Sequence, residues 1–448
     1  MHQKSKTLEP TAKVSGEAAR VAVGDETKWV SSEVMNSGTV LLEAALTREN
    51  MVKAWKRVKA NKGSAGVDGM TIRDAVDYLK SHWLSIKESL LDGTYRPAPV
   101  RRVMIPKSDG TERQLGIPTV LDRVIQQALL QVLQPQIDPS FSEHSYGFRP
   151  KRSAHQAVLK AQEYVQSGRV FVVDVDLEKF FDRVNHDVLM SRLEKRIGDQ
   201  RVLRLIRRYL QAGILADGMT VDRHEGTPQG GPLSPLLANV LLDEVDRALE
   251  KRGHCFVRYA DDCNVYVRSQ QAGERVMAGL RALYGKLRLR LNEAKSAVAK
   301  ATQRKFLGFS FYRYKGQVKR RVAAKALQAY KARIRQLTRR SGGKSIEQVV
   351  EKLRAYQLGW KNYFRLSESP RVFMELDEWL RHRLRMIHLK HWKRGSTAYA
   401  ALIALKASPS DALKVAQNMR CWWVNSMRRL NRALPISYFD RLGVVKLS

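Results

Sequence analysis

An apolar strand-turn-strand unit with two acidic residues at its tip constrains the fold of this chain most strongly. Residues 255–259 and 263–268 are apolar and rich in β-branched and aromatic side chains, and Asp261 and Asp262 lie in the turn between them. An earlier stretch over 169–177 alternates as a strand does. Helical segments lie between these strands at 186–211 and 233–251. The order strand, helix, helix, hairpin predicts an α+β sheet with helices on one face.

The acidic residues of these strands suit a site for hard divalent cations. Side chains alternate between faces along 169–177, so Asp174 and Asp176 share a face and Asp176 lies at the exit of the strand. At least one of Asp261 and Asp262 would reach the same cations as Asp176 from the tip of the hairpin. Carboxylates are ligands that such cations prefer, and a pair of cations can catalyse nucleotidyl transfer. The alternative is that Asp261 and Asp262 are only favourable turn residues.

A second hairpin is predicted nearer the amino terminus. Residues 100–106 are rich in Val, Ile and Arg, a Ser-Asp-Gly turn follows at 108–110, and another strand begins at Gln114. Lys107 and Arg113 flank its tip, where an ammonium and a forked guanidinium suit phosphate oxygens. The alternative is that both are solvated charges. A helix is expected to follow over residues 120–137.

The charge of the chain points to a polyanionic partner. Lys and Arg outnumber Asp and Glu by 80 to 44, which gives a formal net charge of +36. Residues 316–448 hold 29 basic and 8 acidic side chains, so they carry 29 − 8 = 21 of those net charges. A nucleic acid is the natural partner for such a surface. The alternatives are a solvated basic face or a ribosomal type of protein.

Other features bear on where the protein works. Its 3 cysteines include no Cys-x-x-Cys pair, which argues against a zinc finger or a disulfide framework and fits a reduced, cytoplasmic setting. No long apolar run and no signal peptide pattern occur, so membrane insertion is not expected. Residues 1–38 are polar and predict a flexible leader.

Seven blocks of residues carry a resemblance to a known family. They are GVDG at 66–69, IPK to QLGIP over 105–118, SYGFRP at 145–150, DLEKFFD at 176–182, GTPQGGPLSP at 226–235, YADD at 259–262 and KFLGF at 305–309. In this order they make the span from Leu41 to Leu447 resemble the reverse transcriptases, or maturases, that bacterial group II introns encode. The resemblance implies a right-hand polymerase fold: fingers and palm with an antiparallel sheet over 39–315, an all-helical thumb called domain X over 316–395, and a short basic DNA-binding segment over 396–448.

The same resemblance implies a metal centre of the kind that the acidic residues suggest. Asp176 and Asp261 would ligate two Mg²⁺ ions, for which Mn²⁺ could substitute. The backbone carbonyl of Leu177 would complete one ligand shell, and Asp262 would support the site. All three aspartates are therefore expected to be catalytic.

The resemblance also implies which residues bind the incoming nucleotide. Lys107 and Arg113 would hold the triphosphate, and Gln229 would touch the nucleotide. Phe181 would exclude a ribose 2′-hydroxyl, and Lys295 would protonate the leaving pyrophosphate. By their sequence positions alone, Phe181 could instead belong to the core and Lys295 could be a solvated lysine.

The thumb and the segment after it are expected to bind nucleic acid. The candidates for phosphate contacts are Arg381, Arg383, Arg385, Lys390, Lys393 and Arg394. No His-Asn-His endonuclease with paired cysteines follows, so cleavage of a second target strand is not expected. The resemblance implies an RNA-directed DNA polymerase, associated with the bacterial nucleoid, that binds its intron RNA, assists splicing and copies RNA from a primer in target DNA with dNTPs. The alternatives are a related reverse transcriptase recruited for host DNA repair or phage defence, and an RNA chaperone without catalysis.

Overall fold

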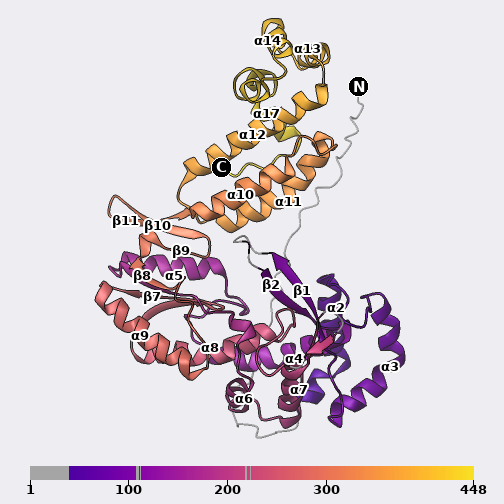
Figure 1. Ribbon diagram of the computed structural model, residues 1–448, viewed down its shortest axis with the longest axis vertical. Coiled ribbons are helices and arrows are strands. Elements are labelled where there is room, and N and C mark those ends of the chain that lie inside the picture. The colour runs from indigo at the N-terminus through magenta and orange to yellow at the C-terminus, as the bar shows by residue number, and fades with distance from the viewer. Residues whose placement is uncertain (1–39, 107–109, 111, 217–218, 222) are drawn as a thin grey trace, which may run out of the picture. The chain divides into compact units, whose positions relative to one another are not determined.

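The computed structural model describes residues 40–106, 110, 112–216, 219–221 and 223–448 (Figure 1). The predicted leader over 1–38 lies outside the described residues. No helix among them is both long and apolar enough to cross a membrane. By their contacts the described residues belong to one compact unit, so the predicted domain boundaries after residues 315 and 395 stay predictions.

A four-stranded antiparallel sheet, the palm sheet, lies at the centre of the first part of this unit. It consists, in spatial order, of β6 (Cys255–Tyr259), β7 (Asp262–Val267), β3 (Phe171–Val175) and β8 (Ala297–Lys300). Alternate side chains of a strand face opposite ways, so Val173 and Val265 enter one buried core while Val172 and Tyr266 enter another. The predicted hairpin and its partner strand are confirmed, with small shifts at their ends.

Helices cover both faces of the palm sheet, although the sequence predicted helices on one face. The first core is completed by α8 (Ser234–Lys251) and α9 (Gln270–Lys286), and the second by α5 (Ala154–Gln166). The prediction was wrong because Val172 and Val173 are both apolar, and a strand that is apolar at consecutive positions needs cover on both sides.

The helix predicted over 186–211 is two helices in the structure. The first, α6 (His186–Glu194), ends before α7 (Gln200–Gln211) begins at the N-cap residue Asp199. The buried Asp199 carboxylate accepts hydrogen bonds from two backbone N–H groups in the first turn of α7, which fixes a new helix start there. It also accepts one from the N–H of Leu42 at 3.1 Å, which ties α7 to the amino-terminal helices.

Helices and a second sheet form the amino-terminal region. The helices are α1 (Leu41–Ala45), α2 (Arg48–Ala60), α3 (Asp74–Leu91) and α4 (Val120–Ile137). The sheet has the order β2-β1-β4-β5 and consists of β1 (Val100–Pro106), β2 (Glu112–Ile117), β4 (Ile214–Ala216) and β5 (Met219–Val221). Antiparallel pairing of β1 with β2 confirms the predicted hairpin, and α4 confirms the helix predicted after it.

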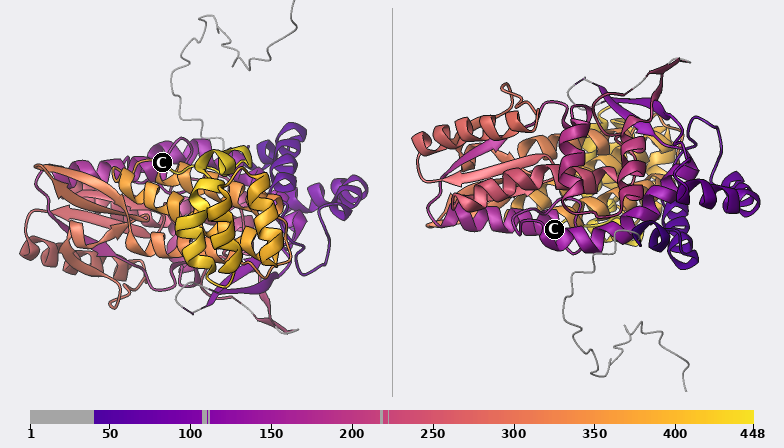
Figure 2. Two further views of the ribbon diagram at one scale, coloured as in Figure 1. Left: turned by 90° about the horizontal axis from the view of Figure 1, so that it is seen from above. Right: turned by 90° about the horizontal axis from the view of Figure 1, so that it is seen from below.

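A third sheet leads into the helical carboxyl-terminal region. Its strands are β9 (Lys305–Phe306), β10 (Phe309–Tyr314) and β11 (Gln317–Val322). The helices that follow are α10 (Ala324–Leu337), α11 (Ile346–Phe364), α12 (Pro370–Trp392), α13 (Gly395–Ala404), α14 (Pro409–Gln417), α15 (Trp422–Val424), the π-helical turn η4 (Asn425–Arg429), α16 (Leu430–Ala433) and α17 (Ile436–Arg441). Figure 2 shows these orange and yellow helices packed together. Sheets with helices, followed by this helical region, confirm the predicted α+β class.

Candidate active site

Strand register brings the acidic residues of distant segments to one end of the palm sheet. The last pair of the β6–β7 hairpin leaves only Ala260 and Asp261 in the turn, with Asp262 as the first residue of β7. Because β7 pairs antiparallel with β3 up to the residues next to Asp262 and Asp176, these two aspartates lie opposite each other. Asp261 directly precedes Asp262, so all three aspartates that the sequence predicted as catalytic lie at this end of the palm sheet.

The loop after α9 fixes the backbone at the exit of β3. The N–H of Asp176 donates to Ser296 Oγ at 3.0 Å, and the Asp176 carbonyl accepts from the N–H of Asn292 at 2.8 Å. The next residue, Leu177, is 5% exposed and forms a β-bridge with Leu291. These bonds hold the backbone that carries the predicted ligands Asp176 and Leu177.

Burial and like charge raise the pKa values of the acidic pair in the turn. Burial, and then the carboxylate of Asp176, raise the pKa of Asp261. Desolvation, followed by the carboxylates of Asp261, Asp174 and Asp176, raises the pKa of Asp262 to about 7, although its side chain still reaches solvent. Oxygen donors that repel one another in this way suit a hard cation in their chemistry. Among the described residues, however, no three acidic, His or Cys side chains are already gathered as a metal site.

Arg304 neutralises Asp174, the other acidic residue of β3. Its Nε and Nη2 lie 2.8 and 2.6 Å from the Asp174 carboxylate, and Nη2 also donates to the Lys295 carbonyl at 2.7 Å. Asp174 thus has a counter-ion from the chain itself. A pocket of about 830 Å³ is lined by Asp176 and Asp262 together with Lys295. Sequence reasoning missed Arg304 because its partner is 130 residues away and no motif links them.

A second pocket gathers most of the residues predicted to bind the nucleotide. It has a volume of about 570 Å³ and is lined by Arg113, Phe181 and Gln229. Arg113 Nε donates to Gln229 Oε1 at 2.5 Å, so a guanidinium and an amide are already coupled there. Lys295 lines the other pocket, with the acidic residues. The predicted triphosphate ligand Lys107 lies outside the described residues.

Glycines let the loop that carries Gln229 pack closely against its neighbours. A Cβ on Gly230 would lie 2.6 Å from the carbonyl oxygen of Gly116 in β2. Gly226 has a φ of +90°, and a Cβ there would lie 2.9 Å from a carbonyl oxygen of the 3₁₀ turn η2 (Phe180–Asp182). Only glycine tolerates such short contacts together with a positive φ. Gly226 and Gly230 therefore hold the loop that carries Gln229 beside β2.

If Arg113 binds the triphosphate as the sequence predicts, its replacement with Ala should raise the KM for dNTPs by about 10- to 100-fold and change kcat less, because one charge-assisted contact to phosphate would be lost. Arg113→Lys should recover part of the affinity, since it restores the charge without the fork. Steady-state primer extension over a range of dNTP concentrations measures both constants. An unchanged KM in Arg113→Ala would show that Arg113 does not bind the triphosphate.

The basic residues predicted to contact phosphate lie in and just after α12 and differ in accessibility. The exposed ones are Lys390, Lys393 and Arg394. Arg381 and Arg383 are half-buried. Arg383 Nε donates to Thr338 Oγ1 at 2.6 Å, and its guanidinium lies 5.5 Å from the centre of the Trp379 ring. Arg383 therefore already packs within the helical region.

Arg385, unlike the other residues predicted to contact phosphate, is buried and bonded within the protein. Its side chain is 3% exposed, and its Nε and Nη2 donate to the Leu434 carbonyl at 3.1 and 2.8 Å. The guanidinium also lies 5.4 Å from the centre of the Phe439 ring, and burial lowers its pKa to about 10. Arg385 binds α12 to the last helices of the chain, and this structural role favours the exposed residues over it as phosphate contacts.

Replacing Arg385 with Met should lower the free energy of unfolding by about 2–4 kcal/mol, because the buried Leu434 carbonyl loses its donors. A triple variant with Lys390→Ala, Lys393→Ala and Arg394→Ala should keep nearly the stability of the wild type. It should bind RNA at least about tenfold more weakly, and the slope of the logarithm of its binding constant against the logarithm of the salt concentration should be smaller in magnitude by about two. Thermal melts and RNA binding across salt concentrations separate the two effects. The reverse pattern would contradict both assignments.

Two family matches cover the regions just described. The reverse transcriptase (RNA-dependent DNA polymerase) family matches residues 105–311, which contain the whole palm sheet, and the group II intron maturase-specific domain matches residues 327–402. Protein YkfC of Escherichia coli strain K12 is 32% identical over 311 residues, which cover 60% of this chain and 82% of YkfC. The chain belongs to the group II intron reverse transcriptase family. The resemblance inferred from the seven blocks is thereby confirmed.

Relatives of this group II intron reverse transcriptase are matched over different shares of their length. The group II intron-encoded protein LtrA of Lactococcus lactis subsp. cremoris is 39% identical over 195 residues, which cover 43% of this chain and 32% of LtrA. A solved chain of a partial Cas6-RT-Cas1--Cas2 complex is 26% identical, with a TM-score of 0.36, over 55% of this chain and 42% of that chain. The match with LtrA thus spans about a third of that relative.

Proposed function

We propose that this group II intron reverse transcriptase copies RNA into DNA from a primer in target DNA. The observation that supports polymerisation most directly is the register that sets Asp176 beside Asp261 and Asp262. These carboxylates and the Leu177 carbonyl would hold two Mg²⁺ ions, with Mn²⁺ as a possible substitute. Bound there, the cations would activate the primer 3′-hydroxyl and would neutralise negative charge on the triphosphate.

The residues that line the two pockets have different roles in the proposed reaction. Arg113, oriented by its hydrogen bond to Gln229, binds the triphosphate together with Lys107. Phe181 closes the sugar side of the same pocket and excludes a 2′-hydroxyl. Lys295 lines the pocket of the acidic residues, from which its ammonium can protonate the leaving pyrophosphate.

The helical region is proposed to bind the intron RNA and thereby assist splicing. Residues 316–448, which contain this region, carry 21 of the 36 net positive charges, and the match to the maturase-specific domain falls on α10 to α13. Exposed Lys390, Lys393 and Arg394 would contact phosphates, and the thumb over 316–395 and the segment over 396–448 would also grip the template duplex and the target DNA. Work on chromosomal target DNA would place the protein at the bacterial nucleoid.

Primer extension tests the polymerase. The wild-type protein, an RNA template annealed to a DNA primer, dNTPs and Mg²⁺ should give full-length DNA, and chelation of the metal should stop synthesis. Mn²⁺ should restore part of the activity. Absence of any product with both cations would refute the proposed activity.

Excision of a group II intron at low Mg²⁺, measured with and without the protein, tests the role in splicing. The protein should increase the excised fraction, because bound cationic side chains replace part of the Mg²⁺ that folds the RNA. Equal excision in both reactions would leave the polymerase as its function.

A further inference from the structure

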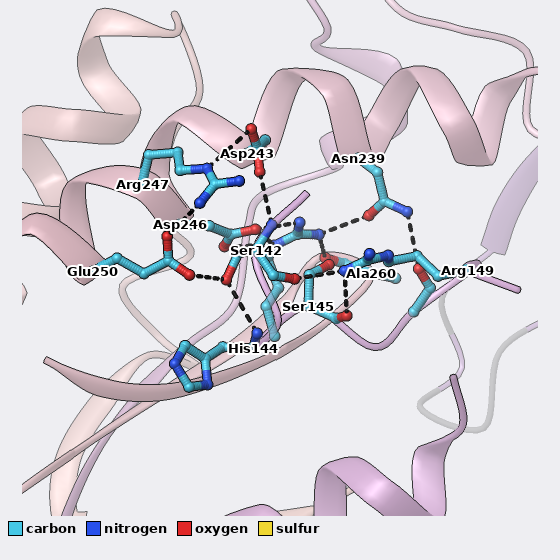
Figure 3. Close-up of polar contacts among 12 residues, drawn as sticks. Ser142, His144, Ser145, Arg149, Asn239, Asp243, Asp246, Arg247, Glu250 and Ala260 are labelled. Carbon is cyan, nitrogen blue, oxygen red and sulfur yellow. Dashed lines mark hydrogen bonds and ion pairs between the residues drawn. The ribbon is translucent and has the colours of Figure 1, made fainter. Parts of the chain in front are cut away.

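Arg258 is a fully buried residue of β6 whose side chain reaches the turn that carries the acidic pair. Its Nε lies 2.8 and 3.0 Å from the two carboxylate oxygens of Asp246, and its Nη2 lies 2.5 Å from one of them. Its Nη1 donates both to Asn239 Oδ1 and to the carbonyl of Ala260, each at 2.9 Å. All five donor contacts of this guanidinium are therefore internal, and one of them ends on the turn itself. Figure 3 labels the partner residues Asp246, Asn239 and Ala260.

The two side chains that bind Arg258 come from one helix, α8. Asp246 and Asn239 lie on α8 and are 0% and 1% exposed. Asn239 Nδ2 also donates to the carbonyl of Gly147 at 2.9 Å, which joins α8 to the segment on the other side of the turn. Side chains of α8 thus bind both the guanidinium of Arg258 and the carbonyl of Gly147.

Gly147 packs directly against the turn. A Cβ there would lie 2.1 Å from the backbone nitrogen of Ala260, so only glycine fits. The same segment is bonded to β6, because the N–H of Tyr146 donates to the Arg258 carbonyl at 2.8 Å and the N–H of Arg258 donates to the His144 carbonyl at 2.9 Å. The backbone at Gly147 and the guanidinium of Arg258 therefore both pack against Ala260 in the turn.

The conformation of the turn explains why such support is needed. Ala260 has a φ of +58°, a left-handed conformation that non-glycine residues rarely adopt without surrounding structure to hold it. Arg258 binds the carbonyl of this residue, and Asp261 follows it directly. A rotation of that peptide would move the carboxylates of Asp261 and Asp262 away from Asp176.

We propose that Arg258, held by Asp246 and Asn239, is a positioning residue that fixes the turn so that Asp261 and Asp262 can share cations with Asp176. This inference rests on the proposed polymerase function. A buried ion pair can be replaced by apolar side chains with little loss of stability, so the stability of the fold does not by itself require the pair of Arg258 and Asp246. What apolar side chains cannot replace is the hydrogen bond from Nη1 to Ala260.

The double variant Arg258→Met with Asp246→Leu separates stability from positioning. It removes both charges together, so no buried charge is left unpaired, and it removes the donor to Ala260. We expect a melting temperature close to that of the wild type, a kcat lower by about 10- to 100-fold, and a half-saturating Mg²⁺ concentration about tenfold higher, with a smaller change in the KM for dNTPs. Mn²⁺ binding to the protein with its template and primer, measured by electron paramagnetic resonance, should weaken in the same proportion.

Arg247→Ala is the matched control. Arg247 is the neighbour of Asp246 on α8, but its guanidinium contacts Asp243 and Glu250 at 3.7 and 2.8 Å and does not reach the turn (Figure 3). Its Mg²⁺ dependence and Mn²⁺ affinity should equal those of the wild type. If the double variant does not fold, Asn239→Ala takes its place, with an expected rise of about threefold in half-saturating Mg²⁺.

Two results would overturn the inference. One is a folded double variant with the Mg²⁺ dependence and the Mn²⁺ affinity of the wild type. The other, where Asn239→Ala is used, is an unchanged Mg²⁺ dependence in that variant. A wild-type protein that binds Mn²⁺ but extends no primer would instead refute the polymerase, so the two failures are distinguishable.

Discussion

Asp261→Asn is expected to lower primer extension by about a thousandfold or more while the protein stays folded. Asn keeps the size of the side chain and removes its charge, and metal-assisted charge stabilisation contributes several kcal/mol, with each 1.36 kcal/mol equal to a tenfold change in rate. The same change also removes a carboxylate whose pKa is raised by burial and by Asp176. Because folding raises this pKa, the carboxylate opposes folding at pH values above its ordinary pKa, so at neutral pH the variant should be as stable as the wild type or slightly more stable.

Single-turnover primer extension and thermal melts, made on the same preparations, measure the two effects. Asp187→Asn is the control, because Asp187 is an exposed residue whose carboxylate pairs with Arg207 at 2.7 Å on the surface. Its rate should equal that of the wild type. Undiminished synthesis by Asp261→Asn would remove Asp261 from the metal site, and a large loss of stability would mean that its carboxylate has a structural role.

Replacing Phe181 with Ala is expected to admit ribonucleotides and to reduce the preference for dNTPs over rNTPs by about a hundredfold. Phe181 lines the pocket of Arg113 and Gln229. In the proposed function its ring occupies the space that the 2′-hydroxyl of a ribonucleotide would need. A site that excludes a group by shape loses that discrimination when the blocking side chain is truncated. The change should appear mainly as a lower KM and higher kcat for rNTPs.

Phe180→Ala provides the comparison that separates selection from packing. The two rings meet edge-on with their centres 5.0 Å apart, but Phe180 is 3% exposed and belongs to the core, whereas Phe181 also lines the pocket. Both variants should lose about 3–5 kcal/mol of stability. Ratios of kcat/KM for dNTPs and rNTPs should change only in Phe181→Ala. Equal sugar discrimination in both variants would show that Phe181 is only a core residue.

Sequence reasoning recovered the local elements of the palm and missed how they are covered. The strand at 171–175 and the β6–β7 hairpin follow from alternation and turn residues, which act over a few neighbours. The helix predicted over 186–211 was interrupted by the buried cap Asp199, whose partner Leu42 is 157 residues away. The number of covered faces likewise depends on helices that pack from elsewhere in the chain.

The predicted site residues show the same division. Asp176, Asp261 and Asp262 could be named from the sequence because an acidic residue at a strand exit and an acidic pair in a tight turn are local patterns. Their proximity depended on the register between β3 and β7. Similar basic residues could not be told apart in advance: the sequence gives Lys390 and Arg385 the same sign, and only burial separates them.

The sequence by itself determined which residues form the strands and turns of the palm, and which side chains bring oxygen donors and positive charge. The tertiary structure alone decided what each charge does. Arg304 neutralises Asp174, Arg258 supports the turn of the acidic pair, and Arg385 ties helices together. The physical reason is that the effect of a charge depends on its burial and on partners that are distant in sequence, whereas strands and turns depend on adjacent residues.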